Sequence, residues 1–198
     1  MEHALELARA PVMLTFPGSS RGAEPASARP ELAATIRAVV SGDQTAFARL
    51  YADYVRMVHA ILLGRVPRRD VDDLVQEVFL TAYTRLRELR DTAAFGGWLA
   101  TIARNRAIDY LRQMREPVEL PPELPGGDPI ESDTLAVLDI VRKLPDAYRD
   151  TLLMRLVEGM TGDEIAARTG LTPGSVRVNL HRGMKMLREQ FGVDTTKP

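Results

Sequence analysis

The 198-residue sequence contains no cysteine and only three histidines, His3, His59 and His181. The missing thiols exclude disulfides, thiol catalysis, iron–sulfur clusters and cysteine-type zinc sites. Because the three histidines are far apart in sequence, we expect no metal site and no cofactor. No apolar run reaches the roughly 20 residues that span a bilayer, and Glu2 and Glu6 stand where a signal peptide needs basic residues. We therefore expect a cytoplasmic protein without membrane insertion.

Charge is nearly balanced, with 26 Lys and Arg against 27 Asp and Glu, but it is unevenly distributed. Residues 116–133 carry six acidic residues and no base, whereas residues 91–115 and 134–198 each carry two more bases than acids. The acidic segment also contains five prolines and a Gly-Gly pair, a composition that disfavours a packed helix or strand. We expect a flexible linker over 116–133 between two domains, a mobile arm over 1–30 and a tail over 193–198.

Apolar residues elsewhere recur with helical spacing, and no segment alternates long enough to indicate a sheet. Over 31–115 the pattern predicts four helices. Asp43 and Asp70 are expected to cap the second and third helices. The Gly-Gly pair at 96–97 is expected to form a short non-helical segment before a fourth helix at 98–115. The sequence thus predicts an all-α protein of two small helical domains.

Residues 134–192, the second predicted domain, follow the pattern of a helix-turn-helix. A helix with Leu156 and Val157 on its packing stripe precedes a capping box at Thr161 and Glu164, then a short helix, a glycine turn and a longer basic helix. In this motif the last helix lies in the major groove of DNA. Its candidate DNA-contacting residues, some for bases and some for phosphates, are Thr172, Ser175, Arg177, Asn179, His181, Arg182 and Lys185. A basic solvated helix at the edge of a bundle is the alternative interpretation.

Two polar patterns in the first domain exceed what a helical core needs. Asp73, Gln76 and Glu77 share one helix face, which indicates either a partner surface or acids that complement the helix dipole. The helix that begins at Trp98 carries a set of polar residues with the chemistry to bind phosphates and unpaired bases: Arg104, Asn105, Arg106, Asp109 and Arg112. A solvated helix face is the alternative for this set.

Three motifs occur in a fixed order: Asp-Leu-Val-Gln-Glu-Val-Phe (73–79), Trp-Leu-Ala-Thr-Ile-Ala-Arg-Asn (98–105) and Glu-Ile-Ala-Ala-Arg-Thr-Gly-Leu (164–171). In this order and spacing, the chain resembles an extracytoplasmic-function (ECF) sigma factor of the sigma-70 family, the small type with regions 2 and 4 alone. The resemblance covers residues from about 31 to 191 and implies that 31–115 form the region 2 bundle and 134–192 the region 4 helix-turn-helix.

The resemblance also implies roles for the candidate residues. Asp73, Gln76 and Glu77 would bind core RNA polymerase at the β′ clamp helices, with a further contact to the β subunit. The set from Arg104 to Arg112 would recognise and melt the −10 promoter element, and the last helix would read the −35 element. Promoter DNA and an anti-sigma factor are the other implied partners, and the chain would not be an enzyme. Where the family often has Ser-Arg, this sequence has Val178-Asn179.

Two other functions are compatible with parts of the sequence. A stand-alone helix-turn-helix regulator would need no helix like that at 73–79. A helical enzyme could use the paired carboxylates Asp72, Asp73 and Glu77, although the sequence has no Glu-x-x-His pair of the di-metal bundle enzymes.

Overall fold

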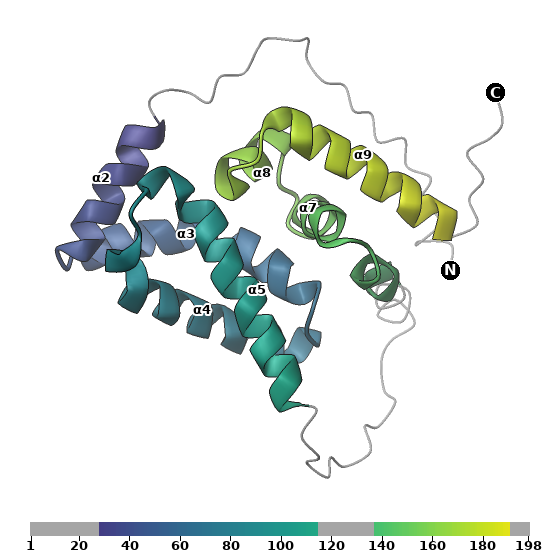
Figure 1. Ribbon diagram of the computed structural model, residues 1–198, viewed down its shortest axis with the longest axis horizontal. Coiled ribbons are helices and arrows are strands. Elements are labelled where there is room, and N and C mark those ends of the chain that lie inside the picture. The colour runs from purple at the N-terminus through teal and green to yellow at the C-terminus, as the bar shows by residue number, and fades with distance from the viewer. Residues whose placement is uncertain (1–27, 115–136, 191–198) are drawn as a thin grey trace.

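The computed structural model describes residues 28–114 and 137–190, and every regular element among them is helical (Figure 1). The α-helices are α2 (Ala28–Val40), α3 (Gln44–Leu63), α4 (Val71–Arg85), α5 (Phe95–Gln113), α7 (Asp146–Leu156), α8 (Gly162–Thr169) and α9 (Pro173–Gln190). Residues 137–142 are also helical, and short 3-10 helices stand at η1 (Arg68–Asp70), η2 (Leu86–Glu88) and η3 (Thr92–Ala94). The predicted all-α class is confirmed. The predicted linker, the tail and the arm up to residue 27 lie outside the described residues.

Helix α3 is the centre of the first half, with α2, α4 and α5 packed around it. It begins where predicted, because Oδ1 of Asp43 accepts the backbone N–H groups of Thr45 at 2.8 Å and Ala46 at 3.0 Å. Gly42 precedes this cap with φ +96°, a turn conformation that glycine adopts without strain. Helix α2 starts inside the segment predicted as an arm, and Pro30 is tolerated in its first turn.

Asp70 stands at the N-cap position of α4 but makes no capping hydrogen bond there. Its carboxylate instead accepts the hydroxyl of Tyr110 at 2.7 Å. Burial and this hydrogen bond raise the pKa of Tyr110 to about 12. Asp70 therefore does not cap α4 as predicted, and its hydrogen bond instead joins the start of α4 to the last turns of α5. A pattern of neighbouring residues in the sequence does not reveal such a long-range contact.

The predicted break at 96–97 is wrong, because both glycines lie in the first turn of α5. A Cβ atom on Gly96 would stand 1.9 Å from the carbonyl oxygen of Arg168 in α8. A Cβ atom on Gly97 would be 3.8 Å from the carbonyl oxygen of Thr169, an ordinary contact distance. Gly96 thus allows two backbones to approach closely and does not interrupt the helix.

The caps of the second half are as predicted. Thr161 and Glu164 form a reciprocal capping box that opens α8, and hydrogen bonds from the Thr161 backbone and side chain hold the pKa of Glu164 below its ordinary value. Helix α8 ends at Gly170, which adopts φ +75°. Oγ1 of Thr172 then accepts the N–H of Ser175 at 3.1 Å and starts α9. Helices α8 and α9 with this turn make the helix-turn-helix.

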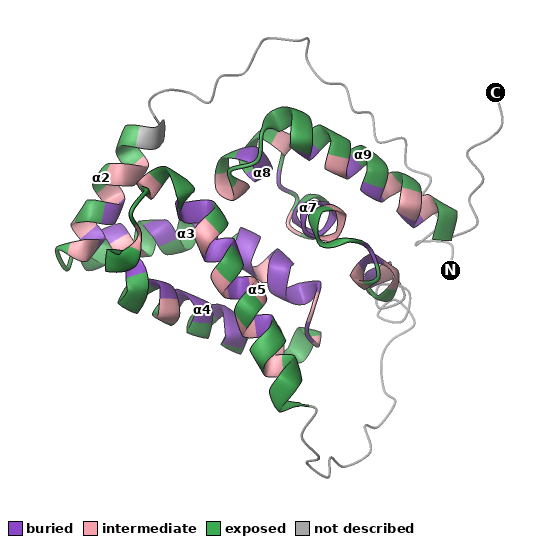
Figure 2. Cartoon of the chain, in the orientation of Figure 1, coloured by how far each residue is buried: buried purple, intermediate pink, exposed green. Residues whose placement is uncertain are grey.

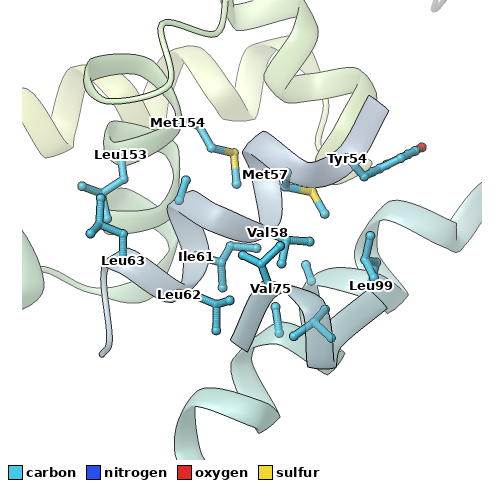
Figure 3. Packing of buried hydrophobic residues seen from close by; sticks show 14 of the residues in the cluster. Tyr54, Met57, Val58, Ile61, Leu62, Leu63, Val75, Leu99, Leu153 and Met154 are labelled. Atoms are coloured by element: carbon cyan, nitrogen blue, oxygen red, sulfur yellow. The ribbon is translucent and has the colours of Figure 1, made fainter. Parts of the chain in front are cut away.

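Helix α7 packs on two sides at once. Its residues 150–154 are all buried. Because five consecutive residues point in different directions around a helix axis, their burial requires other elements to pack on more than one side of α7. On one side Gly183 of α9 lies so close that a Cβ atom would be 2.9 Å from Leu152. On the other side Leu153 lies beside Leu63 of α3 in the shared core (Figure 3).

The two halves of the chain therefore share one hydrophobic core, and buried residues line the facing sides of α3 and α7 (Figure 2). The prediction that Leu156 and Val157 face the core is wrong, since they are 41% and 47% exposed. Both stand at the end of α7, just before the chain turns at Gly159 with φ +62°. No helix in the described ranges is long and apolar enough to cross a membrane.

Candidate functional site

The outer face of α4 carries the three predicted partner-binding residues side by side. Asp73, Gln76 and Glu77 are all exposed at the i, i+3 and i+4 spacing that places them in one row. Leu80 continues this row one turn later and is 64% exposed. Leu80 was not predicted as a member of this row. Its position in the sequence could have indicated it, because Leu80 falls outside the buried stripe that includes Val78. The four residues form the α4 surface, an acidic row that ends in an apolar side chain.

The predicted DNA-contacting residues of α5 do not all lie on one surface. Arg106 forms an ion pair with Glu77 and so belongs to the boundary between α5 and α4. Asp109 and Arg112 are exposed further along α5, with 3.8 Å between their charged groups. The structure thus links one predicted promoter residue to the α4 surface, a connection that periodicity alone does not indicate.

Arg104 and Asn105 line an open cleft of about 520 Å³ between α5, the end of α3 and α7, and Asn105 shares its helix face with Asp109 and Arg112. The cleft is strongly basic, because Arg65, Arg142 and Arg149 join Arg104 in its walls. Ile108 and Leu111 of α5 line it as well and are 46% and 40% exposed. A groove with guanidinium groups, an amide and apolar surface has the chemistry to hold a nucleic-acid strand.

Asp150 of α7 lies behind this cleft, where it pairs with two arginines of the cleft wall, and it is almost completely buried. Its Oδ1 accepts from Nη1 of Arg65 at 2.6 Å, and its Oδ2 accepts from Nη2 of Arg65 at 3.3 Å. The same Oδ2 accepts from Nε and Nη2 of Arg104 at 3.2 and 3.0 Å. The side chains of Asp150 and Arg65 are only 5% and 8% exposed, so the carboxylate exchanges water for four N–H groups.

Asp146 and Arg149 add one carboxylate and one guanidinium group to the cleft. Burial raises the pKa of the Asp146 carboxyl, but the charges of Arg65 and Arg149 outweigh it and hold that pKa below its usual range. Burial and the neighbouring Arg65 lower the pKa of Arg149. Nε of Arg149 is buried and has no hydrogen-bond partner among the described residues. Two carboxylates thus neutralise only part of a cluster of guanidinium groups.

Most of the predicted residues of α9 are exposed, and they lie on the side of the helix away from α7 (Figure 2). Arg177, His181, Arg182 and Lys185 are exposed, whereas Asn179 is half-buried. The hydroxyls of Thr172 and Ser175 lie 2.8 Å apart and contribute to the N-cap of the helix. The structure therefore brings the basic members of the predicted set onto one outward face and gives the two hydroxyl residues a capping role.

Two family models match the chain, one on each side of the segment between α5 and α7. Sigma-70 region 2 matches residues 50–116, and Sigma-70 region 4 matches residues 134–187. The first range holds most of α3 with α4 and α5, and the second holds α7, α8 and most of α9. Residues 50–116 are thus region 2 and residues 134–187 are region 4.

Curated relatives match both ranges together. The ECF RNA polymerase sigma factor SigW of Bacillus subtilis is 28% identical over 178 residues, which cover 79% of this chain and 94% of that protein. The RNA polymerase sigma factor CarQ of Myxococcus xanthus is 32% identical over 160 residues, which cover 76% of this chain and 92% of that protein. The chain belongs to the ECF sigma factor family. The ECF sigma-E factor of Escherichia coli K12 is 30% identical to this sigma factor, over 77% of the chain and 90% of that protein.

A solved structure shares the fold of this sigma factor. CnrH, determined in complex with the cytosolic domain of CnrY, matches with a TM-score of 0.55 and 25% identity, over 82% of this chain and 97% of that chain. This sigma factor therefore acts in transcription initiation, as the resemblance implied. The alternative of a stand-alone regulator leaves the region 2 match unexplained. Within the described residues, no group of three or more His, Asp or Glu side chains is placed to hold a metal ion.

Regions 2 and 4 of this sigma factor meet along a junction rich in charge. Arg168 of α8 pairs with Asp53 of α3 at 3.0 Å, with its guanidinium 5.1 Å from the centre of the Tyr54 ring. Arg142 donates to the backbone carbonyl of Val66 at 3.0 Å, beyond the end of α3. Arg56 of α3 donates to the carbonyl of Glu158, which follows α7. The two regions are thus held together at the edge of their common core by an ion pair and by hydrogen bonds from arginines to backbone carbonyls.

His59 adds a pH-dependent contact to the junction. Its Nδ1 lies 2.6 Å from Oε1 of Glu158, and the two side chains are 30% and 14% exposed. The hydrogen bond to Glu158 raises the pKa of His59 more than burial lowers it. The charges of Glu158 and Asp72 add to the increase, and that of Arg68 opposes it. The protonated imidazole is therefore favoured in the folded junction.

The raised pKa predicts that the junction is more stable in mildly acidic solution. The contribution of His59 is fully present below the unfolded pKa of about 6.5 and is lost as the pH rises through the higher folded pKa. We expect His59→Gln to remove about 1 kcal/mol of unfolding free energy at pH 6 and less at pH 8. Urea unfolding at both pH values measures this difference. The exposed His181→Gln is the control, and equal effects of both variants at both pH values would contradict the role of His59.

Proposed function

We propose that this sigma factor divides promoter-specific initiation among three surfaces. The α4 surface binds core RNA polymerase, the cleft side of α5 holds the −10 element as a melted strand, and the outer face of α9 reads the −35 element. The observation that carries the proposal is the exposed basic face of α9, which follows a complete helix-turn-helix and lies opposite its packing on α7. We assign this sigma factor to the cytoplasm, because it acts there together with core RNA polymerase.

The outer face of α9 supports a specific assignment of contacts. Arg177 lies in the first half of the helix, the part that meets base edges in this motif, and its guanidinium matches the O6 and N7 atoms of guanine. Val178, where the family often has serine, is 44% exposed and offers an apolar contact for a thymine methyl group. Arg182 and Lys185 stand further along the helix and bind phosphates.

The side of α5 that faces the cleft supports binding of a single strand. Asn105 is exposed and has both a donor and an acceptor for the edge of an unpaired base. Arg104 stands beside it with a guanidinium for the backbone, and Ile108 offers apolar surface for a base. Arg106, in contrast, supports the α4 surface through its pair with Glu77, so we assign it a positioning role there.

Further proposals concern the organisation and the partners of the chain. Residues 31–115 and 134–192 act as the two functional units, and the acidic segment 116–133 connects them inside the polymerase. The solved relative CnrH binds the cytosolic domain of another protein, CnrY. We propose an anti-sigma factor as the regulatory partner of this sigma factor too.

Replacing Arg177 and Lys185 separately tests the assignment of α9. Arg177→Ala is expected to relax the preference at one base pair of the −35 element by about 1–3 kcal/mol, since it removes a bidentate base contact. Lys185→Ala is expected to weaken binding to all sequences about equally and to reduce the slope of log K against log salt by about 1. Selection of promoters from a randomised library by holoenzyme, followed by binding measurements across a salt series, measures both effects.

Glu189→Gln is the matched control for this experiment, because Glu189 lies on α9 and pairs only loosely with Lys185, at 3.9 Å. It should leave the selected sequence unchanged. A uniform loss of binding in Arg177→Ala, with no change in sequence preference, would show that α9 does not read the promoter through this residue.

A further inference from the structure

Asp150 joins the two regions through groups that region 2 also needs for DNA. The carboxylate belongs to α7 of region 4, yet both of its guanidinium partners come from region 2, Arg65 from the turn after α3 and Arg104 from α5. Arg104 lies one residue before Asn105 and lines the same cleft, so it belongs to the proposed −10 surface. In the present arrangement Asp150 therefore pairs with the Arg104 guanidinium, which the promoter strand would otherwise bind.

The geometry around Asp150 is that of a phosphate site filled by a carboxylate. Guanidinium groups bind carboxylates and phosphates in the same forked manner, and here two of them converge on one carboxylate. The side chain of Arg65 is 8% exposed, and both of its carboxylate partners, Asp146 and Asp150, belong to α7, whereas its other hydrogen bond goes to the carbonyl of Ile61 in α3. If α7 moves away, Arg65 and Arg104 are left as an unneutralised pair in an open groove.

We propose that a phosphate of the promoter strand replaces Asp150 on Arg65 and Arg104, so that region 4 inhibits strand binding by region 2 until the two regions separate. This inference rests on the proposed function of α5. It assigns Arg65 as a phosphate-binding residue and Asp150 as the internal competitor of the DNA. Carboxylate and phosphate cannot occupy the two guanidinium groups together, which makes the closed junction and strand binding mutually exclusive.

The close approach of α5 and α8 provides an independent way to open the junction. Gly96 of region 2 faces the backbone carbonyl of Arg168 in region 4, and a Cβ atom there would be 1.9 Å from that oxygen. Because the obstacle is backbone, Gly96→Ala must displace α8. Gly97→Ala adds the same methyl group one residue later, where the nearest atom would be 3.8 Å away. The two variants differ in the junction but not in charge, and both glycines lie in the first turn of α5.

The first test measures binding of the full chain, without polymerase, to a fluorescent single-stranded DNA of mixed sequence at low salt. Asp150→Asn is expected to increase the affinity about tenfold, because it raises the fraction of chains whose site is open. Asp163→Asn, at an exposed carboxylate in the first turn of α8, changes the net charge equally and should alter the affinity by less than about twofold. Equal affinities of these two variants would overturn the proposal.

The second test uses steric opening and remains decisive if Asp150→Asn fails to fold. Because the chain has no cysteine, dyes on Gln44→Cys and Gln190→Cys report the separation of the two regions. Gly96→Ala should reduce energy transfer between the dyes and increase DNA affinity about tenfold, whereas Gly97→Ala should do neither. Separation of the regions without any gain in DNA affinity would overturn the competition.

Arg65→Gln then distinguishes a phosphate-binding residue from a purely structural one. In the Gly96→Ala background it should remove most of the gained affinity, although the junction is already open. Promoter-specific transcription by wild-type holoenzyme is recorded in parallel. If that transcription succeeds while the variants bind DNA no better than their controls, the competition is wrong and the proposed function stands. If it fails while Asp150→Asn still binds more tightly, the promoter function is wrong and the competition holds for single-stranded DNA in general.

Discussion

Asp73→Arg is expected to weaken binding of this sigma factor to core RNA polymerase by about 100-fold, or about 3 kcal/mol. Asp73 is exposed at the N-terminal end of the α4 surface. Charge reversal there places a cation against a surface that must complement Asp73 and Glu77, and like charges across an interface cost several kcal/mol. A binding assay with labelled core enzyme measures the change directly.

Asp72→Arg is the matched control for this prediction. Asp72 is adjacent in sequence, exposed and in the same first turn of α4, so both variants lose the same interaction with the helix dipole. It points about 100° away from Asp73 around the helix axis and should change the affinity far less. Glu77 is less suitable for charge reversal, because an arginine there would face Arg106 and disturb the packing of α4 on α5. Equal losses in the two aspartate variants would rule out a localised α4 surface.

Asn105→Ala is expected to slow promoter opening by about 10-fold to 100-fold without affecting binding to core polymerase. Extruding a base costs a few kcal/mol, and Asn105 is placed to return part of that cost through hydrogen bonds to the base edge. The defect should disappear on a template that is already melted around the −10 element, since extrusion is then no longer needed. Permanganate reactivity of thymines on duplex and melted templates measures this difference.

Gln113→Ala provides the control for the opening experiment. It removes an exposed amide from the last turn of the same helix, two turns beyond Asn105 and outside the residues that line the cleft. It should open the promoter at the wild-type rate. A defect of Asn105→Ala that persists on the melted template would instead indicate a role in strand binding after opening.

Local signals in the sequence were sufficient for the ends of most helices. Asp43, Thr161 and Thr172 cap helices as predicted, because a cap depends on residues within one turn. The glycines at 96–97 were misinterpreted as a break because Gly96 is needed for the approach of Arg168, 72 residues later in the chain. The same limit applies to Asp70, which bonds Tyr110 and not its own helix.

The sequence predicted which helix face carries each candidate residue, but not which side chains contact one another. Helical spacing placed Asp73, Gln76 and Glu77 in one row, and the structure keeps them there. The pairing of Glu77 with Arg106 and the burial of Asp150 between two arginines depend on how four helices cross, and residue periodicity carries no such information. The ion pairs of Asp150 with Arg65 and Arg104 are also the basis of the proposed competition between region 4 and promoter DNA.

Run-off transcription by purified core polymerase, with and without this chain, is the most direct measurement of its role. On a promoter selected from a random library, the chain should produce one transcript with a fixed start, absent with core enzyme alone and lost with Asp73→Arg. A chain that binds the same DNA yet leaves core polymerase unable to start there, or an Asp73→Arg variant as active as wild type, would contradict initiation through the α4 surface.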